Sequence, residues 1–227
     1  MQENIPRSIG IIMDGNRRWA KAKSLPVFEG HRAGYEKLKE VADWCIAAGV
    51  RHLTVYAFST ENWNRSVEEV GYLMNLFRAV VGSMVTDAQK RNTRLIFLGE
   101  RTRLDADIRA AIENAEEVTR ANDSFVFGIA LSYGGRAEII DAIRRIPKEE
   151  LSAITEEEFS QLLWAKEIPD PDLVLRTSGE ERLSNFLPWQ SVYSELFFTK
   201  TLWPDLSREE FEKILAEYAE RDRRRGK

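Results

Sequence analysis

Short apolar runs alternate with segments of helical periodicity along this chain, and no other feature constrains its fold as strongly. Between the runs, apolar residues recur every three or four positions, as in Leu38, Val41 and Cys45. Strands that alternate with helices form right-handed crossovers and a largely parallel sheet covered on both faces. We therefore predict one α/β domain over residues 1–227, with a central, largely parallel six-stranded sheet flanked by helices. The six runs are Ile9–Met13, Leu53–Phe58, Leu95–Leu98, Val126–Leu131, Leu173–Leu175 and Glu195–Thr199.

Helix starts are marked by capping-box spacing, in which a serine or threonine precedes a glutamate by three positions. The most polar stretch, residues 147–158, predicts a surface connection. No repeat, low-complexity tract or flexible linker divides the sequence, so the prediction remains a single domain. The capping pairs are Ser66 with Glu69, Thr155 with Glu158, and Ser207 with Glu210.

Composition excludes several classes of protein. A net charge of -4 argues against general binding of nucleic acid. Cys45 is the single cysteine, which excludes a disulfide framework, and His31 and His52 are too far apart in sequence to indicate a zinc site. The sequence shows neither a signal-peptide pattern nor an apolar run long enough to cross a bilayer, so we expect a cytoplasmic protein.

The first apolar run ends at a turn that combines features of an anion site and a cation site. Asp14, Gly15 and Asn16 end the strand and open a helix whose first turn carries Arg17 and Arg18. A helix N-terminus beside two arginines favours anions, so a carboxylate there indicates that Mg²⁺ joins Asp14 to a diphosphate. The alternative interpretation is an ordinary strand-to-helix turn with Asp14 as the helix cap.

Polar side chains also follow three other predicted strands. They are found in residues 59–65, 132–136 and 176–185, which are rich in arginines, small hydroxyls and amides. Because ligands of parallel sheets bind at the carboxyl ends of strands, we expect these segments to converge. Their convergence predicts a site for two phosphate-bearing groups.

Several candidate residues have two interpretations. Arg176, Arg182 and Ser184 are spaced to surround an anion. The alternative is that this loop forms a surface salt-bridge network with Glu180 and Glu181. Asn62 can relay a proton if it is hydrogen-bonded to the hydroxyl of Ser59. A lone histidine such as His31 is more often a structural hydrogen-bonding residue than a catalyst.

Two further residues have open alternatives. Trp63 either contacts a ligand or lid as an exposed ring or packs into the core. Glu195 lies in an apolar run and needs a partner, which is either the same divalent cation or an arginine. Another apolar set either lines a cavity or forms ordinary core: Phe58, Leu73, Leu76, Phe77, Val80, Leu98, Phe125, Phe127, Ile129 and Leu131.

Motifs along nearly the whole chain resemble those of the cis-prenyltransferases, most closely the bacterial undecaprenyl diphosphate synthases. The resemblance implies Mg²⁺-dependent condensation of isopentenyl diphosphate with an allylic diphosphate such as farnesyl diphosphate, in cis configuration. It also implies a homodimer, a hydrophobic tunnel, an undecaprenyl carrier lipid for cell-wall synthesis, and transient membrane-surface contact during product release. The matching motifs are Met13–Asn16, Gly30–His31, Tyr56–Arg65, Tyr133–Arg136, Asp172–Glu180, Arg182–Phe186, Trp189–Gln190 and Leu202–Asp205.

The resemblance implies a role for each matched residue. Asp14 would be the metal-associated catalytic carboxylate, Asn62 the proton acceptor, and Glu195 a second Mg²⁺ ligand. The closing segment 224–226 would reach the site of the partner subunit. The allylic diphosphate would be bound by Gly15, Asn16, Arg17, Arg18, Trp19 and His31. The central and lid region would contain Ser59, Thr60, Glu61, Trp63 and Arg65. Isopentenyl diphosphate would be bound by Arg176, Arg182, Leu183 and Ser184.

Two other functions remain open. A non-catalytic partner subunit of the same fold would keep the architecture without the reaction. A phosphate-ester hydrolase or nucleotide-binding module would use the same sheet edge and would need no apolar tunnel. The sequence has no Gly-x-x-x-x-Gly-Lys-Ser/Thr loop and no Gly-x-Gly-x-x-Gly after a strand, which disfavours P-loop and dinucleotide chemistry.

Overall fold

A computed structural model describes residues 4–221 of the chain as one α/β domain. All six predicted strands are present, and each neighbouring pair is parallel, in the order β3-β4-β2-β1-β5-β6. The prediction of a six-stranded parallel sheet is therefore confirmed. The strands are β1 Ser8–Ile12, β2 His52–Ser59, β3 Thr93–Leu98, β4 Phe125–Tyr133, β5 Leu173–Arg176 and β6 Glu195–Phe198.

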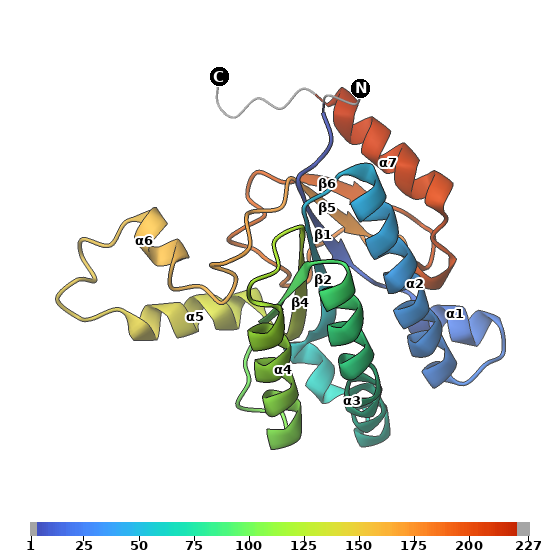
Figure 1. The fold of residues 1–227 in the computed structure, drawn as a ribbon, viewed down its shortest axis with the longest axis horizontal. Coiled ribbons are helices and arrows are strands. Elements are labelled where there is room, and N and C mark those ends of the chain that lie inside the picture. Colours follow the sequence, from blue (N-terminus) through green and yellow to red (C-terminus); the bar gives the residue numbers. More distant parts are fainter. Residues whose placement is uncertain (1–3, 222–227) are drawn as a thin grey trace.

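The helices between residues 27 and 119 and the last helix pack on one face of the sheet, and non-helical segments around residues 164–168 and 183–187 cover the other face. The three expected caps are present, since Ser66, Thr155 and Ser207 each accept a hydrogen bond from the backbone N–H three residues later. Figure 1 shows α5 and α6 extending away from the sheet on one side of the molecule. The helices are α1 Asn16–Ala22, α2 Val27–Ala48, α3 Val67–Lys90, α4 Ala106–Thr119, α5 Gly135–Arg145, α6 Glu156–Ser160 and α7 Arg208–Glu220, with 3-10 turns η1 Thr60–Asn64 and η2 Trp203–Asp205.

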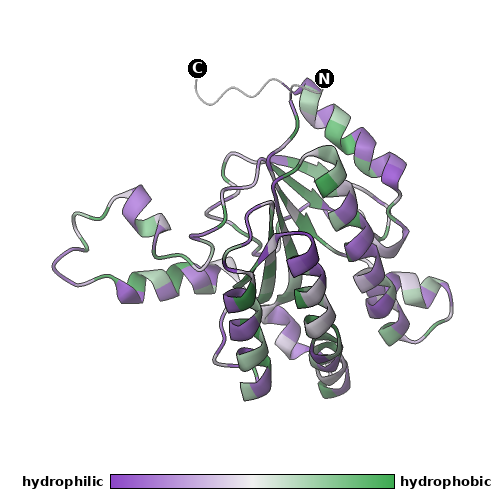
Figure 2. Cartoon of the chain, in the orientation of Figure 1, coloured by the Kyte–Doolittle hydropathy of each residue, from purple (hydrophilic) through white to green (hydrophobic). Residues whose placement is uncertain are grey.

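Strand side chains alternate between two apolar layers. In β3, Leu95 and Phe97 belong to the larger core, which also contains side chains of α2, α3, α4 and α7. Ile96 and Leu98 belong to a second core on the opposite face. Figure 2 shows the apolar strands at the centre with hydrophilic residues spread over the helices outside. Leu98 was predicted to share a face with the cavity candidates and does not, because the period of a strand places it on the other side.

The turn after β1 depends on a glycine. Gly15 is the N-cap of α1 at φ +114°, and no side chain caps this helix. The interpretation of Asp14 as the helix cap is therefore wrong, and its carboxylate is free for other contacts. Two glycines of α2 allow α1 to approach closely, because a Cβ at Gly30 or Gly34 would collide with Asn16.

The described part of the chain has no helix that is both long enough and apolar enough to cross a membrane.

Candidate active site

The carboxyl ends of β1 and β5 bring Asp14 and Arg176 together. Nη2 of Arg176 donates to Oδ2 of Asp14 at 2.9 Å, and Nη1 donates to Oγ of Ser184 and to the carbonyl of Arg182, each at 2.6 Å. Arg176 is only 5% exposed, and within residues 4–221 its buried Nε has no hydrogen-bond partner. A buried guanidinium with an unused donor fits an anionic ligand.

The carboxylate of Asp14 stays ionised at neutral pH. Burial alone would raise its pKa, but the hydrogen bond and charge of Arg176, together with the charge of Arg18, outweigh burial and hold the pKa of Asp14 below its usual range. The guanidinium of Arg18 lies 3.5 Å from Oδ2 of Asp14. Both arginines therefore contact the same carboxylate oxygen.

Two adjoining polar pockets, of about 690 and 680 Å³, meet at Asp14. We call them the first and second pocket. Their shared walls predict that ligands in the two pockets would lie next to each other. The residues common to both are Met13, Asp14, Asn16, His31 and Arg65.

The first pocket surrounds the start of α1 and is strongly basic. Arg18 is held in place by donating to the carbonyl of Ser178 at 3.0 Å and to its hydroxyl. Backbone N–H groups and arginines at a helix N-terminus form an anion site. Besides the shared residues, the lining includes Gly15, Arg17, Arg18, Lys21, Ser24, Leu25 and Val27.

A buried cluster joins α2 to α3 beside the first pocket. His31 Nε2 lies 3.2 Å from Oε1 of Glu69, which also accepts from Arg65 at 2.9 Å and lies 3.8 Å from Arg17. Burial lowers the pKa of His31, and Glu69 only partly opposes this, so the imidazole is neutral at pH 7. Because a carboxylate oxygen only accepts, Nε2–H of the neutral His31 donates to Glu69, which leaves Nδ1 as an acceptor and no positive charge for a ligand.

The second pocket combines residues from four segments that follow strands. The Oδ1 atom of Asn62 accepts from the backbone N–H of Ser59 at 3.1 Å, and the Ser59 side chain accepts from the backbone of Asn62. The expected contact between the Asn62 side chain and the Ser59 hydroxyl is thus replaced by a side chain-to-backbone pair. The lining also includes Tyr56, Glu61, Arg136, Arg176, Ser184 and Asn185.

Three of these lining residues were not among the sequence-predicted site residues. Arg136 lies in the first turn of α5 directly after β4, and Asn185 follows Ser184 in the loop between β5 and β6. Both belong to the polar segments that follow predicted strands, and this position in the sequence could have identified them as site residues. Tyr56 lies within β2, where its apolar surroundings conceal it in the sequence.

Some predicted site residues lie outside both pocket linings. Trp19 donates to Asp205 at 2.6 Å, and Arg182 is paired with Glu180 at 2.5 Å with its side chain 61% exposed. Leu183 packs against the second core, and Thr60 contacts Glu61. For Arg182, the surface ion pair is the observed alternative.

Trp63 is a packing residue. Its ring meets Phe58 edge-on at 5.0 Å and packs against the larger core, and its Nε1 donates to Ser132 at 3.0 Å. The core-packing alternative is therefore observed for Trp63, whose ring is partly buried. Its role is to hold η1 against the sheet.

Glu195 lies at the opposite end of the sheet from Asp14. The register pairs Glu195 with Leu173, and Leu173 with Ile9. Asp14 is five positions after Ile9 in the chain, which corresponds to about 16 Å along the strand direction. Glu195 binds Arg221 at 2.6 Å, so the arginine alternative is observed. One chain does not bring Asp14 and Glu195 to the same metal ion.

The donor set at Asp14 fits Mg²⁺ only together with a substrate. Within residues 4–221, no three histidine, cysteine or acidic side chains are grouped to hold a metal. Mg²⁺ commonly binds one or two carboxylates, several waters and substrate phosphates. One ionised carboxylate facing two anion pockets matches that pattern.

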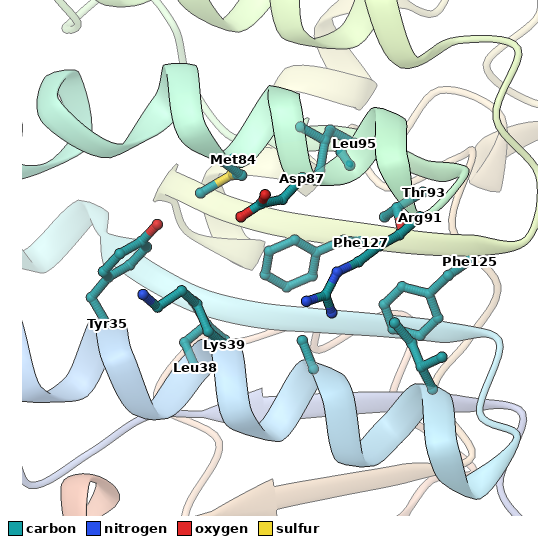
Figure 3. Close-up of a pocket in the computed structure, with 13 residues that line it drawn as sticks. Tyr35, Leu38, Lys39, Met84, Asp87, Arg91, Thr93, Leu95, Phe125 and Phe127 are labelled. Atoms are coloured by element: carbon teal, nitrogen blue, oxygen red, sulfur yellow. The ribbon is translucent and has the colours of Figure 1, made fainter.

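Two apolar cavities continue from the polar pockets into the space between α2 and α3. The near cavity, about 120 Å³, shares Met13, Asn16 and His31 with both polar pockets. The far cavity, about 100 Å³, lies beyond it and has Phe125 and Phe127 in its walls (Figure 3). Apart from Leu98, the other predicted cavity residues line the near cavity: Phe58, Leu73, Leu76, Phe77, Val80, Ile129 and Leu131.

Sequence comparison matches residues 12–226 to the prenyltransferase family model for undecaprenyl diphosphate synthase. The chain is 46% identical over 226 residues to an isoprenyl transferase of Fusobacterium nucleatum, covering 100% of this chain and 98% of that protein. It is 47% identical over 234 residues to an isoprenyl transferase of Streptococcus pyogenes serotype M6, covering 99% and 94% of the two chains.

Two solved structures share the architecture. A lavandulyl diphosphate synthase from Lavandula x intermedia, in complex with dimethylallyl diphosphate, superposes with a TM-score of 0.93 at 34% identity, covering 98% of this chain and 99% of that one. A probable undecaprenyl diphosphate synthase from Campylobacter jejuni superposes with a TM-score of 0.83 at 33% identity, covering 99% and 100%.

Proposed function

We propose that this chain, which belongs to the undecaprenyl diphosphate synthase family of prenyltransferases, condenses isopentenyl diphosphate with an allylic diphosphate in cis configuration. Farnesyl diphosphate is the proposed starter and a polyprenyl diphosphate the product. We propose further that the product serves as the undecaprenyl carrier lipid for cell-wall synthesis.

One observation carries the proposal: two anion pockets share the carboxylate of Asp14, and both continue into an apolar cavity through Met13, Asn16 and His31. The reaction needs two diphosphates side by side and an apolar space for one growing hydrocarbon tail. A phosphate-ester hydrolase needs only one anion pocket and no such cavity. The geometry therefore favours condensation over hydrolysis.

The arginines supply most of the proposed transition-state stabilisation. When the allylic carbon–oxygen bond breaks, negative charge develops on the departing diphosphate. Arg17 and Arg18 line the pocket assigned to it, and they stabilise that charge more in the transition state than in the ground state. Arg176 and Ser184, with Arg136, hold the second diphosphate. Asn62, in the same pocket, is the proposed proton acceptor.

Mg²⁺ bound by Asp14 and substrate phosphate oxygens would neutralise diphosphate charge and help the leaving group depart. The low pKa of Asp14 keeps this ligand ionised without substrate. The residues of this chain then orient the isopentenyl double bond and keep the apolar tail away from water.

A homodimer is the proposed assembly. Strand β6 is at the end of the sheet, and four apolar side chains on or just before it are exposed: Val192, Tyr193, Leu196 and Phe198. A second copy would cover this surface. Glu195 belongs to the same strand, and the proposed C-terminal segment 224–226 lies outside the described residues. The proposed location is the cytoplasm, with transient membrane-surface contact during product release.

The test combines purified protein with farnesyl diphosphate, labelled isopentenyl diphosphate and Mg²⁺, followed by extraction and sizing of labelled lipid. Wild type should yield prenyl product, and chelation of Mg²⁺ should abolish it. Asp14→Asn should lower kcat by about 10²–10³-fold while changing KM far less. Asp123→Asn, at an exposed turn before β4, is the matched control and should keep normal turnover.

Two outcomes would contradict the proposal. Wild type that incorporates no label would be a non-catalytic subunit, and release of inorganic phosphate from simple esters would indicate a hydrolase. Near-normal turnover of Asp14→Asn with Mg²⁺ would refute the role of Asp14.

A further inference from the structure

Asn185 connects three walls of the second pocket. Its Oδ1 accepts from the backbone N–H of Arg136 at 2.8 Å, and its Nδ2 donates to Oε1 of Glu61 at 3.0 Å. Its own carbonyl accepts from the backbone N–H of Gly135 at 2.9 Å. One residue therefore joins the β5–β6 loop to the start of α5 and to η1.

The backbone at this position favours asparagine. Asn185 has φ +70°, and its neighbour Ser184 has φ +46°. Asparagine is among the few non-glycine residues that adopt this left-handed conformation readily. Side-chain amides also offer a donor and an acceptor at once, which the contacts to Glu61 and Arg136 require.

Two contacts of Asn185 reach residues that line the second pocket, Arg136 and Glu61. Ser184, the preceding residue, accepts from Arg176 at 2.6 Å. Glu61 precedes Asn62 in η1. Partial burial would raise the pKa of the Glu61 carboxyl, but hydrogen bonds from its own backbone, from Asn185 and from neighbouring hydroxyls outweigh burial and keep this pKa below its usual value. The contact from Nδ2 of Asn185 thus ends on an ionised oxygen, which makes it stronger than a neutral hydrogen bond.

We infer that Asn185 is a positioning residue for isopentenyl diphosphate. It holds Ser184, Arg136 and η1 at the spacing that one diphosphate in the second pocket requires. It is absent from the lining of the first pocket, so the allylic diphosphate should be affected much less. This inference rests on the proposed function of the second pocket.

The decisive measurement is the KM of each substrate in Asn185→Gly. Glycine keeps the left-handed backbone and removes both side-chain hydrogen bonds. We expect the KM for isopentenyl diphosphate to rise about tenfold or more, since each lost contact typically costs several-fold in binding. The KM for farnesyl diphosphate should stay within about twofold of wild type, because Asn185 does not line the first pocket and no hydrogen bond is lost there.

Asn92→Gly is a matched control. Asn92 also has a positive φ, +51°, and its Nδ2 atom donates to Asp123 and to Ser124, each at 2.8 Å. It lies between α3 and β3, at the amino end of the sheet. Asn92→Gly should destabilise the protein by a similar amount and leave both KM values unchanged.

A second variant decides the matter if Asn185→Gly does not fold. Asn185→Asp keeps the shape and the acceptor for Arg136, but it replaces the donor to Glu61 by a second carboxylate. Like charges in contact disfavour each other, so the same selective rise in KM for isopentenyl diphosphate is expected.

The outcomes separate this inference from the proposed function. Wild type without prenyl transfer would refute the function itself. Active wild type with unchanged KM values in both Asn185 variants would overturn the inference alone. An equal rise of both KM values would show a merely structural role and would overturn it as well.

Discussion

The contacts of single side chains could be predicted from the sequence at some positions and not at others. Asp14 and Arg176 could be predicted because each lies at the carboxyl end of a strand, so the parallel sheet had to bring them to one edge. The partners of Trp63 and Glu195 could not be predicted in this way. Ser132 lies 69 residues from Trp63, and Arg221 lies 26 residues from Glu195. Only the folded chain determines which distant group satisfies a polar atom.

The histidine beside the first pocket predicts a pH dependence of stability. Burial lowers the pKa of His31 below 6.5, so the unfolded chain binds a proton at this position more readily than the folded chain. The free energy of unfolding is therefore highest above pH 6.5 with respect to this group. It falls as the pH drops from 6.5 toward the lower folded pKa.

Replacing the imidazole should remove that dependence. His31→Gln retains a donor to Glu69 but does not titrate, so urea unfolding at about pH 7.5 and about pH 5 should differ less than in wild type. Burial also lowers the pKa of His52, at a site away from both pockets, so His52→Gln should reduce the pH difference as well, and the two substitutions together should reduce it further. If His31→Gln keeps the full difference of wild type, the assignment is wrong.

At the scale of elements, strand identities could be predicted from apolar runs, and helix starts from capping pairs. The shape of η1 could not, because its capping contacts between Ser59 and Asn62 involve both side chains and backbone. The turn between β1 and α1 was recognisable from its residue types. The need for a left-handed glycine there follows from φ, which the sequence indicates only indirectly.

Gly15→Ala tests that turn. A Cβ at Gly15 would lie 3.0–3.1 Å from atoms of Leu202 at φ +114°, so we expect a loss of about 1–3 kcal/mol of stability. The start of α1 should also shift and weaken binding of the allylic diphosphate. Gly71→Ala, in α3 with open space around it, should instead stabilise the protein by about 0.5–1 kcal/mol. Urea denaturation measures the free energy of unfolding of the two variants. Equal values for Gly15→Ala and Gly71→Ala would exclude strain at Gly15.

The packing of α2 against α3 predicts a change in product length. Tyr35, Leu38 and Met84 are in the wall of the far cavity, where Figure 3 labels them, and they also line the near cavity, so they stand between the two. Cavities of this size each hold about one five-carbon unit, since roughly 150 Å³ accommodates benzene. Tyr35→Ala should therefore give longer products by mass analysis, while Glu36→Ala, on the exposed side of α2, should not. An unchanged product distribution in Tyr35→Ala would contradict this.

For the whole molecule, the fold class followed from strand–helix alternation, but the strand order did not. Crossover rules fix the hand of each connection and leave several orders open. The observed order places β1 next to β5 and brings residues 162 positions apart into contact, Asp14 and Arg176. It also leaves β6 as an edge strand, which sequence alone could not indicate.

The exposed edge predicts the assembly in solution. Tyr193 is 72% exposed beside β6, and a charge there should oppose burial against a second copy. Wild type should have the mass of a dimer by light scattering, and Tyr193→Asp should shift it toward the monomer. Val118→Asp, at an exposed apolar residue of α4, should remain dimeric. Monomeric wild type at micromolar concentration would refute the prediction.

Met13, Asn16 and His31 line both polar pockets and the near cavity at once. In the proposed reaction, a change at any of them alters the surroundings of the leaving group, the incoming group and the hydrocarbon simultaneously. Kinetic effects of substitutions there will not add, and a single variant cannot be attributed to one substrate. Thermodynamic cycles that pair each of these residues with a residue of only one pocket are the appropriate way to separate the contributions.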